Sequence, residues 1–326
     1  MAHRVETQRI RVNLRSGQTV TIPGWRVDSG TAGPCLLLTA AQHGNEVQGA
    51  EAIRRFVEDA AERLTNGRVF AVPMVNLPAV RERRPHIRMR PEQPYGDARG
   101  HNMNHWWSGE KSGNDTARLA RAIYEAIGAE ATHALDLHCW EKHKAGAVLV
   151  RDVPGIRELA GKLGHRFVDI RPPNDRSLGG YFCATGRVGI TYEFSGQYVV
   201  LEHEVRHGLM LIRNLAKALG MLPGRLSAGH RSVLFSDECE SVDVTAPCSG
   251  LFVTAPGGVY ESVVEGRLLG HVLSDIDLSV HQIHAPTDGY LRVFGASRAN
   301  CDVAMPGHHP YVTKGERLAT VAFKVN

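Results

Sequence analysis

The 326-residue sequence contains no apolar run that approaches the length of a membrane span, and residues 1–6 lack the apolar core of a secretion signal. We therefore expect no membrane association and a cytoplasmic location. Its six cysteines are scattered without paired spacing, which argues against a disulfide framework or a cysteine-based zinc module. A large basic excess is also missing, because 38 lysines and arginines accompany 34 acidic residues. Nucleic-acid binding is thus not expected.

The sequence is long enough to bury a sizeable core, and 17 histidines are its one enriched residue count. Residues 34–40 form an apolar run of strand length, 46–64 follow a helical pattern, and 68–74 return to a strand pattern. This strand, helix, strand order is a βαβ unit and predicts a parallel sheet.

The same alternation continues after a long connection at 76–114 that has no clear period. The chain is thus predicted to form an α/β fold with a mixed, mostly parallel sheet and helices on both faces. Near residue 224 the pattern changes to short strands separated by turn residues, so we predict an α/β domain at 1–223 and an all-β domain at 224–326. The other predicted elements are a hairpin at 7–13 and 17–26, strands at 131–139, 146–151, 166–170 and 187–194, and helices at 115–128, 154–163 and 199–219.

The first candidate for chemistry is the tetrapeptide His-Gly-Asn-Glu at 43–46, where the strand at 34–40 ends and a helix begins. Ligands bind at the carboxyl ends of strands in α/β proteins. His43 at the strand end and Glu46 in the first helical turn can reach one metal ion from the same side. This pattern alone occurs often by chance, so it indicates only half of a zinc site.

The strand at 131–139 provides a second half, because Asp136 and His138 are two residues apart and point to the same face. His138 would complete a His, Glu, His ligand set that leaves a fourth position for water, as in catalytic zinc sites. Asp136 is placed to accept the other ring N–H of a ligating histidine. The alternative for each residue is an ordinary hydrogen-bonded polar side chain at a strand end.

Glu193 is a single carboxylate at the end of the apolar strand 187–194. A water activated by zinc needs a nearby base, and a partly desolvated glutamate suits that task. The alternative is a glutamate that only pairs with an arginine at the sheet edge.

Together these segments resemble the succinylglutamate desuccinylase/aspartoacylase family of the zinc carboxypeptidase superfamily. The resemblance extends over about residues 34–200 and rests on the order of three motifs, His-Gly-x-Glu, Asp-Leu-His and a late Thr-Tyr-Glu. It implies one zinc ion per chain, held by His43, Glu46 and His138, with Glu193 as general base and acid.

The segment 76–84 resembles the family's Asn-x-Pro-Ala stretch, which leads to an arginine that polarises the scissile carbonyl. That position falls on Pro85, so the resemblance implies Arg83 or Arg84 in its place, where a guanidinium would stabilise the developing oxyanion. The alternative is a solvated basic loop or a phosphate-binding patch, formed by Arg81, Arg83, Arg84, Arg88 and Arg90.

The segment 100–109 resembles a family stretch of Asn-Arg followed by Phe-Pro-Gly. Asn104 matches the asparagine, but His105 replaces an arginine that clamps a substrate carboxylate, and a histidine lacks the bidentate fork. An acidic acyl group is therefore in doubt. Trp106 and Trp107 are candidates to line a substrate pocket, with simple packing as the alternative.

Residues 177–182 contain paired glycines before the Glu193 strand, which favours a mobile loop or a turn beside the site, with Tyr181 as a possible donor to the substrate. The C-terminal domain resembles barrel-sandwich domains related to biotinyl and lipoyl carriers. It offers no lysine between its halves, so we expect it to cap the site or build a homo-oligomer.

The resemblance and the motifs together predict a zinc-dependent hydrolase that cleaves the amide bond of a small N-acyl amino acid or related metabolite. Within enzymes, the alternative is a metallocarboxypeptidase or an ester or lactam hydrolase that uses the same site. The alternative outside the enzymes is a non-catalytic binding protein on the same scaffold.

Overall fold

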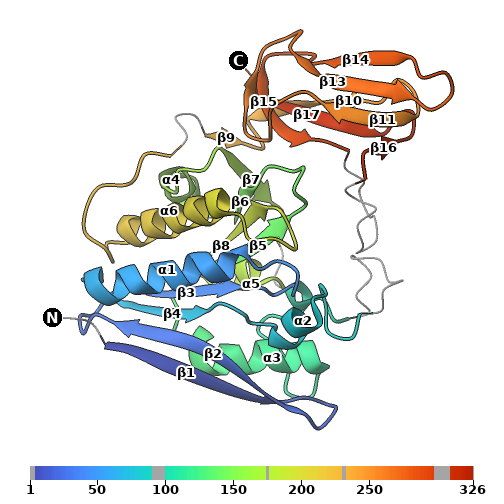
Figure 1. Cartoon of the computed structure of the whole chain (residues 1–326). Helices are drawn as coiled ribbons and strands as arrows, with labels where there is room; N and C mark the ends of the chain where they lie inside the picture. Colours follow the sequence, from blue (N-terminus) through green and yellow to red (C-terminus); the bar gives the residue numbers. More distant parts are fainter. Residues whose placement is uncertain (1–3, 90–99, 174–175, 230–232, 297–308, 326) are drawn as a thin grey trace.

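The computed structural model describes residues 4–89, 100–173, 176–229, 233–296 and 309–325 (Figure 1). Arg90 and Cys301 lie outside these ranges. Within them, no helix is long and apolar enough to cross a membrane. The other five cysteines are free thiols.

The larger part of the molecule is built on one sheet of nine strands, in the order β1-β2-β4-β3-β5-β8-β6-β7-β9. Five of its eight neighbouring pairs are parallel, which confirms the predicted mixed, mostly parallel sheet. The strands are β1 Arg4–Asn13, β2 Thr19–Asp28, β3 Cys35–Ala40, β4 Arg68–Val72, β5 His133–Trp140, β6 Ala147–Arg151, β7 Phe167–Arg171, β8 Val188–Ser195 and β9 Leu234–Phe235.

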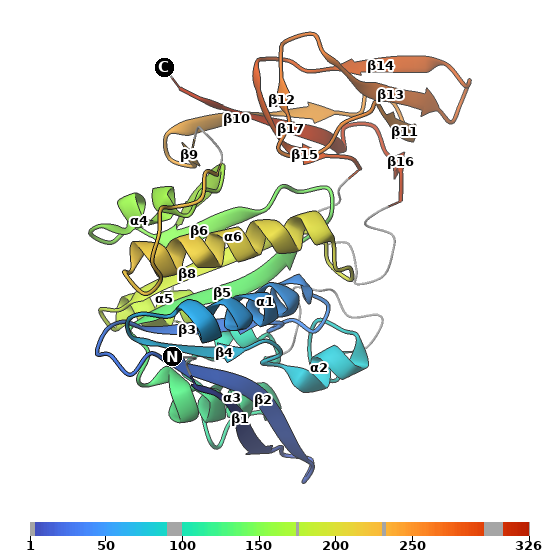
Figure 2. The same cartoon turned by 60° about the vertical axis from the view of Figure 1, so that its left-hand side comes forward.

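Helices cover both faces of this sheet (Figure 2). On one face, α1 (Gln48–Arg63), α4 (Ile156–Lys162) and α6 (Glu202–Ala218) bury apolar side chains against the strands. On the other, α2 (Leu77–Glu82), α3 (Asp115–Ile123) and α5 (Leu178–Ala184) enclose a second apolar cluster. The buried residues of α1 recur every three or four positions, the pattern that predicted this helix.

The helix α5 corrects the prediction of a mobile loop or turn at 177–182. Ser177 caps the helix, because its hydroxyl oxygen accepts a hydrogen bond from the Gly180 N–H. The glycines permit close packing instead of mobility. A Cβ on Gly189 of β8 would lie 2.0 Å from the Gly179 oxygen, so α5 rests directly on the strand that carries Glu193.

The first sheet also extends past residue 224, where we predicted the domain boundary. Its edge strand β9 pairs in parallel with β7 at Leu234 and Phe235. These two residues form a short edge strand, so the chain leaves the first sheet only after residue 235.

The C-terminal part consists of two four-stranded antiparallel sheets, as expected for an all-β domain. Both sheets contribute to a single apolar core, which contains Phe252, Val272 and Leu318. One sheet has the order β10-β17-β15-β12 and the other β14-β13-β11-β16. The strands are β10 Cys239–Thr245, β11 Gly250–Thr254, β12 Ser262–Val263, β13 Leu268–Ser274, β14 Val280–His284, β15 Gly289–Phe294, β16 Tyr311–Val312 and β17 Arg317–Lys324.

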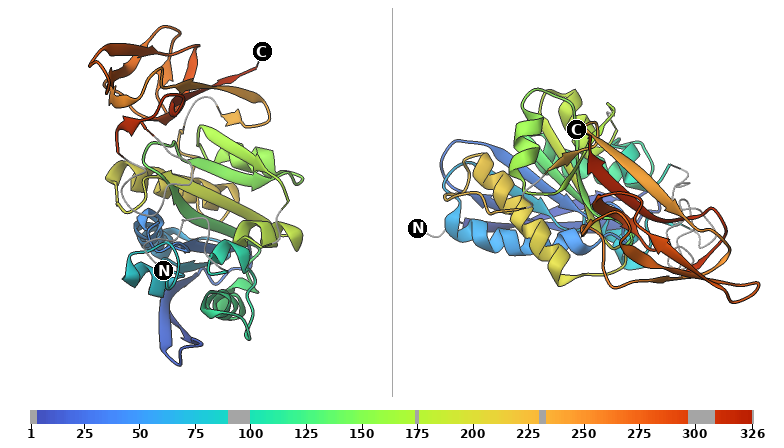
Figure 3. Two further views of the ribbon diagram at one scale, coloured as in Figure 1. Left: turned by 90° about the vertical axis from the view of Figure 1, so that its right-hand side faces the viewer. Right: turned by 90° about the horizontal axis from the view of Figure 1, so that it is seen from above.

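The C-terminal domain packs against the β6 and β7 end of the first sheet (Figure 3). A partly buried ion pair joins the two parts, since one guanidinium nitrogen of Arg292 lies 2.6 Å from each carboxylate oxygen of Asp169. The backbone of the loop between β5 and β6 adds hydrogen bonds to β15, such as Ala145 N–H to the Arg292 carbonyl oxygen at 2.8 Å. The two domains therefore meet next to the carboxyl ends of β5 and β8.

Candidate metal centre

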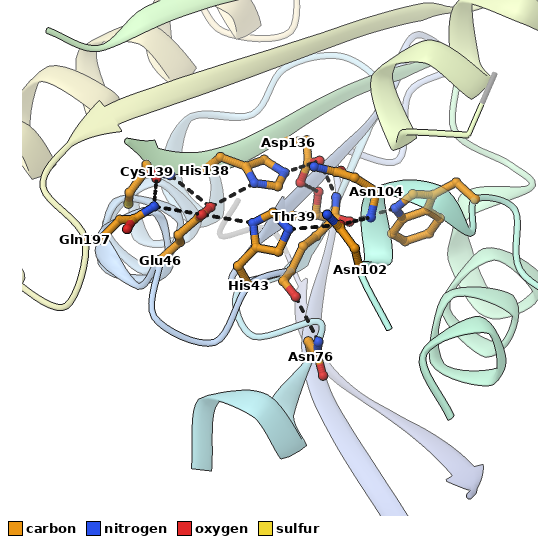
Figure 4. Close-up of polar contacts among 12 residues, drawn as sticks. Thr39, His43, Glu46, Asn76, Asn102, Asn104, Asp136, His138, Cys139 and Gln197 are labelled. Carbon is orange, nitrogen blue, oxygen red and sulfur yellow. Dashed lines mark hydrogen bonds and ion pairs between the residues drawn. The ribbon is translucent and has the colours of Figure 1, made fainter. Parts of the chain in front are cut away.

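Three buried donor groups meet at the carboxyl edge of the first sheet (Figure 4). His43 and Glu46 lie in the loop between β3 and α1, and His138 lies on β5. One donor atom from each lies within 4.8 Å of the other two, close enough for all three to hold one metal ion. Glu46 precedes α1 by two residues, which corrects the expectation that it belongs to the first helical turn.

The carboxylate of Glu46 lies between the two imidazoles. Its Oε1 is 2.9 Å from Nδ1 of His43, and its Oε2 is 2.9 Å from Nδ1 of His138. The other ring nitrogens point away from this centre. Nε2 of His138 lies 2.8 Å from Oδ2 of Asp136, and Nε2 of His43 lies 3.1 Å from Oδ1 of Asn102. Each histidine is thus oriented by an oxygen acceptor on its far side, as metal-ligating histidines usually are.

Asp136 is itself held by buried side chains. The Thr39 hydroxyl donates to its Oδ1 at 2.7 Å, and the Gln42 amide donates to its Oδ2. The indole N–H of Trp107 in turn donates to the Gln42 side-chain oxygen at 2.9 Å. A continuous chain of hydrogen bonds therefore runs from Trp107 to His138.

The loop at 42–46 is fixed against the segment that follows β4. The Asn76 side chain donates to the Gln42 carbonyl oxygen at 2.8 Å, and the Gly44 N–H donates to the Pro85 carbonyl oxygen at 3.1 Å. A Cβ on Gly44 would lie 2.2 Å from the backbone carbonyl carbon of Ala79. Only glycine permits this approach, which explains the glycine beside His43.

The electrostatics of the centre favour a bound cation. Burial lowers the pKa of His138, but the carboxylates of Asp136 and Glu46 outweigh it and raise that pKa well above its usual value. Burial likewise raises the pKa of Glu46, but His43 and His138 hold it far below its usual range. Two buried carboxylates facing two imidazoles thus attract positive charge. One carboxylate and two imidazole nitrogens are also the donor types that zinc prefers, so the residues fit this metal.

Glu193 lies beside this centre, because β5 and β8 pair in parallel with His138 opposite Glu193. Neighbouring strands are about 4.8 Å apart, so the two side chains rise from the same face side by side. Burial raises the pKa of Glu193 to about 8, against the opposing charge of His138. Its Oε2 is buried without a hydrogen-bond partner among the described residues.

Sequence reasoning missed several groups that contact the centre. Asn102 accepts from His43, the Gln197 amide lies 3.3 Å from Oε1 of Glu46, and the His86 ring packs edge-on against His43 with centroids 5.2 Å apart. All three lie in connecting segments, where no period marks which side chains turn inward. The one available signal was proximity in sequence to Asn104 and Glu193.

The two candidate arginines differ in their surroundings. Arg83 is exposed at the C-terminal end of α2 in the left-handed backbone region, with a φ of 56°. Arg84 is partly buried and donates to the Met89 carbonyl oxygen. Burial and the charge of Glu46 raise the pKa of Tyr198, and the charge of Arg84 lowers it. The Tyr198 N–H donates to the Asn45 carbonyl oxygen at 2.8 Å, so Arg84 acts on a residue that contacts the loop carrying Glu46.

The segment 102–107 reaches the centre through residues other than those predicted. Asn104 donates its backbone N–H to Oδ1 of Asn102 at 3.0 Å, and His105 is exposed. Trp107 is buried in the core, whereas Trp106 is partly buried and donates its indole N–H to the Gly100 carbonyl oxygen. Trp107 thus packs and supports Gln42.

Tyr181 is placed among aromatic and basic groups. Its hydroxyl lies 3.3 Å from that of Tyr124, the two rings pack edge-on, and Arg187 lies over its ring. Its partners therefore belong to the π-helical turn after α3 and to the turn after α5, and a further hydrogen bond joins it to Ser108. The contacts described for Tyr181 include none with a residue of the metal centre.

Comparison with known proteins identifies the family. The profile of the succinylglutamate desuccinylase/aspartoacylase catalytic domain matches residues 32–154. This segment belongs to that family. It includes His43, Glu46 and His138, so the resemblance to this family is confirmed over the segment that carries the first two motifs.

An N-alpha-acetyl-L-2,4-diaminobutyric acid deacetylase from Halomonas elongata is 32% identical over 106 residues, which span 32% of this chain but only 28% of that enzyme. The crystal structure of a succinylglutamate desuccinylase/aspartoacylase from Rhodobacter sphaeroides has a TM-score of 0.68 at 22% identity, and the match covers 100% of this chain and 96% of that one. A metallo-carboxypeptidase from Burkholderia cenocepacia matches 66% of this chain and 65% of its own, with a TM-score of 0.52 and 13% identity. The first domain of the protein therefore has a carboxypeptidase-like fold.

Proposed function

We propose that the protein is a zinc-dependent deacylase that hydrolyses the amide bond of a small N-acyl amino acid or a related metabolite. The observation that carries the proposal is the convergence of His43, Glu46 and His138 on one buried point, with Asp136 and Asn102 behind the two imidazoles. The family match and the deacetylase relative support the reaction class.

Zinc, when bound, would polarise the scissile carbonyl and lower the pKa of a water molecule. His43, Glu46 and His138 would hold it. Glu193 would take a proton from the attacking water and return it to the leaving amine. A carboxyl group whose pKa is raised to about 8 can hold that proton near neutral pH. Of the two arginines implied by the resemblance, we favour Arg84 to stabilise the carbonyl oxygen, because its charge reaches the surroundings of Glu46.

Two measurements test the proposal. Protein purified without chelator should contain about one zinc per chain, and it should hydrolyse at least one member of a panel of N-acyl amino acids. Peptides, esters and lactams belong in the same panel, because they separate the deacylase from the other hydrolases that this site would serve. Metal in fewer than about a tenth of the chains, together with no turnover after zinc is added, would reject the enzyme in favour of a binding protein.

A further inference from the structure

The loop at 141–146 carries a positive charge over the carboxyl end of β8. β8 lies between β5 and β6, so the loop that joins those two strands has to cross its end. The crossing is fixed by two hydrogen bonds: the Ser195 hydroxyl donates to the Lys142 carbonyl oxygen at 3.1 Å, and the Gly196 N–H donates to that of Trp140 at 2.9 Å. The loop therefore lies next to the strand end that carries Glu193.

Lys144 is held within this loop by an aromatic ring. Its Nζ lies 3.3 Å from the centroid of the Trp140 ring, within the range of a cation–π interaction. Trp140 is two residues beyond His138 on β5, so its side chain rises from the same face of the sheet. The ammonium group thus rests on a side chain two positions beyond His138 on the same strand.

Within the described ranges, no carboxylate neutralises this ammonium group. The acidic groups that act on it are Glu141, Glu193 and Asp169, and none forms an ion pair with it in the described part of the chain. Both oxygens of Asp169 are bound by Arg292. A partly buried cation without an anion is costly unless a partner arrives.

The C-terminal domain fixes the loop from the other side. Lys144 forms an isolated backbone bridge to Val293, and the Phe294 N–H donates to the His143 carbonyl oxygen at 2.8 Å. The loop backbone is thus fixed, and the ammonium group rests on the Trp140 ring, so ordering it around an anion costs little entropy.

We propose that Lys144 binds the carboxylate of the substrate and so selects acyl amino acids whose carboxyl group is free. This inference rests on the proposed deacylase function and names the chemical class of substrate. The nearness of Lys144 to the reacting groups is supported by its effect on Glu193, since its charge lowers the pKa that burial raises. The carboxylate site is thus formed between the β5–β6 loop and β15, whereas His105 is exposed on another segment.

The test compares N-acetyl amino acids with their carboxamides, which differ only in the charge of this group. The wild type should prefer the acids by at least about tenfold in kcat/KM, since hydrogen bonds to charged groups contribute tenfold or more. Lys144→Met should abolish most of this preference, mainly by raising KM for the acids, and Lys144→Arg should retain it. Lys142 is an exposed lysine of the same loop, and the control variant Lys142→Met should show the same preference as the wild type.

The outcomes separate the two proposals. Two results would overturn the role of Lys144. The first is a wild type that hydrolyses acid and amide equally well, and the second is a Lys144→Met variant that keeps the preference for the acid. In both cases the deacylase would stand. Binding of each acid and amide to Glu193→Gln, measured by calorimetry, gives the same preference without turnover. If neither turnover nor binding occurs with any compound, both proposals fall.

Discussion

Glu46 and Glu193 are carboxyl groups at the same edge of one sheet, and their surroundings drive their pKa values in opposite directions. Glu46 is held far below its usual pKa, whereas the pKa of Glu193 is raised to about 8. Burial favours the protonated form of both. The difference is therefore due to their hydrogen-bond partners and neighbouring charges.

Glu46 lies within hydrogen-bonding distance of four groups. Its two oxygens face the imidazoles of His43 and His138, the amide of Gln197 and the N–H of Cys139. Glu193 has a buried oxygen without such a partner among the described residues. One carboxylate is thus prepared to stay charged and hold a cation, and the other to carry a proton. Pairs of this kind commonly divide ligand or stabilising roles from acid and base roles.

Glu193→Gln should produce the largest effect and is the most direct way to break the comparison. The amide keeps the shape but cannot carry the proton, so turnover should fall by about 10²–10⁴-fold while zinc content remains near one per chain. Metal analysis and steady-state kinetics on the same preparation check this. Turnover close to that of the wild type would remove Glu193 from the mechanism.

Glu46→Gln should have the opposite signature. Loss of the charged ligand should weaken zinc binding by more than about a hundredfold, since even residues behind the ligands contribute 10- to 100-fold. Competition with a chelator measures this affinity, and excess zinc should restore part of the activity. An unchanged affinity would show that Glu46 is not a ligand.

The contrast also explains which parts of the centre could be predicted. His138 and Glu193 stand near the ends of apolar strands, whose period fixes the face of their side chains, and His43 follows three residues after the end of β3. Parallel pairing then brings those ends together. Residues near the ends of the predicted strands were therefore expected to lie close together, and the structure places them so.

The residues that support the ligands from connecting segments could not be predicted in this way. Asn102 and Gln197 belong to connecting segments whose course depends on tertiary packing. The same limit applies to α5, where glycines that are typical of a loop instead permit close contact with β8. It also applies to β9, because two residues have no period.

Glu204 tests whether burial alone raises a carboxyl pKa in this fold. It is buried on α6, where burial raises its pKa to about 7 although the Ser195 N–H and the Tyr260 hydroxyl donate to it. A pKa raised in the folded state means that the contribution of Glu204 to stability is fully present below about pH 4.5 and is lost as the pH rises through about 7. The loss is on the order of 3 kcal/mol.

Glu204→Gln should therefore flatten the fall in stability between pH 4.5 and 7, measured as the urea midpoint at several pH values. Glu202→Gln, two residues away on the same helix, is the matched control. The pKa of the exposed Glu202 is lowered to about 2 by Arg55 and Arg206, so its titration lies outside this window. Equal slopes in wild type and Glu204→Gln would show that burial does not raise the pKa of Glu204.

The smallest expected effect concerns the hydrogen bonds that link His138 through Asp136 and Gln42 to Trp107. Trp107→Phe keeps the packing of the buried ring but removes the N–H that holds Gln42, which in turn holds Asp136. Zinc affinity should fall by about tenfold, because the acceptor that orients His138 is less firmly held.

Trp106→Phe is the control for this change, since its indole N–H binds the Gly100 carbonyl oxygen and not the centre. Chelator competition on both variants should thus give a weaker affinity for Trp107→Phe alone. With zinc saturating, the catalytic rate of Trp107→Phe should stay near that of the wild type, because Glu193 lies outside this chain of hydrogen bonds. If Trp107→Phe lowered the catalytic rate but left the zinc affinity unchanged, its hydrogen bonds would act on Glu193 and not on the metal ligands. The ligands and Glu193 would then not be independent of each other.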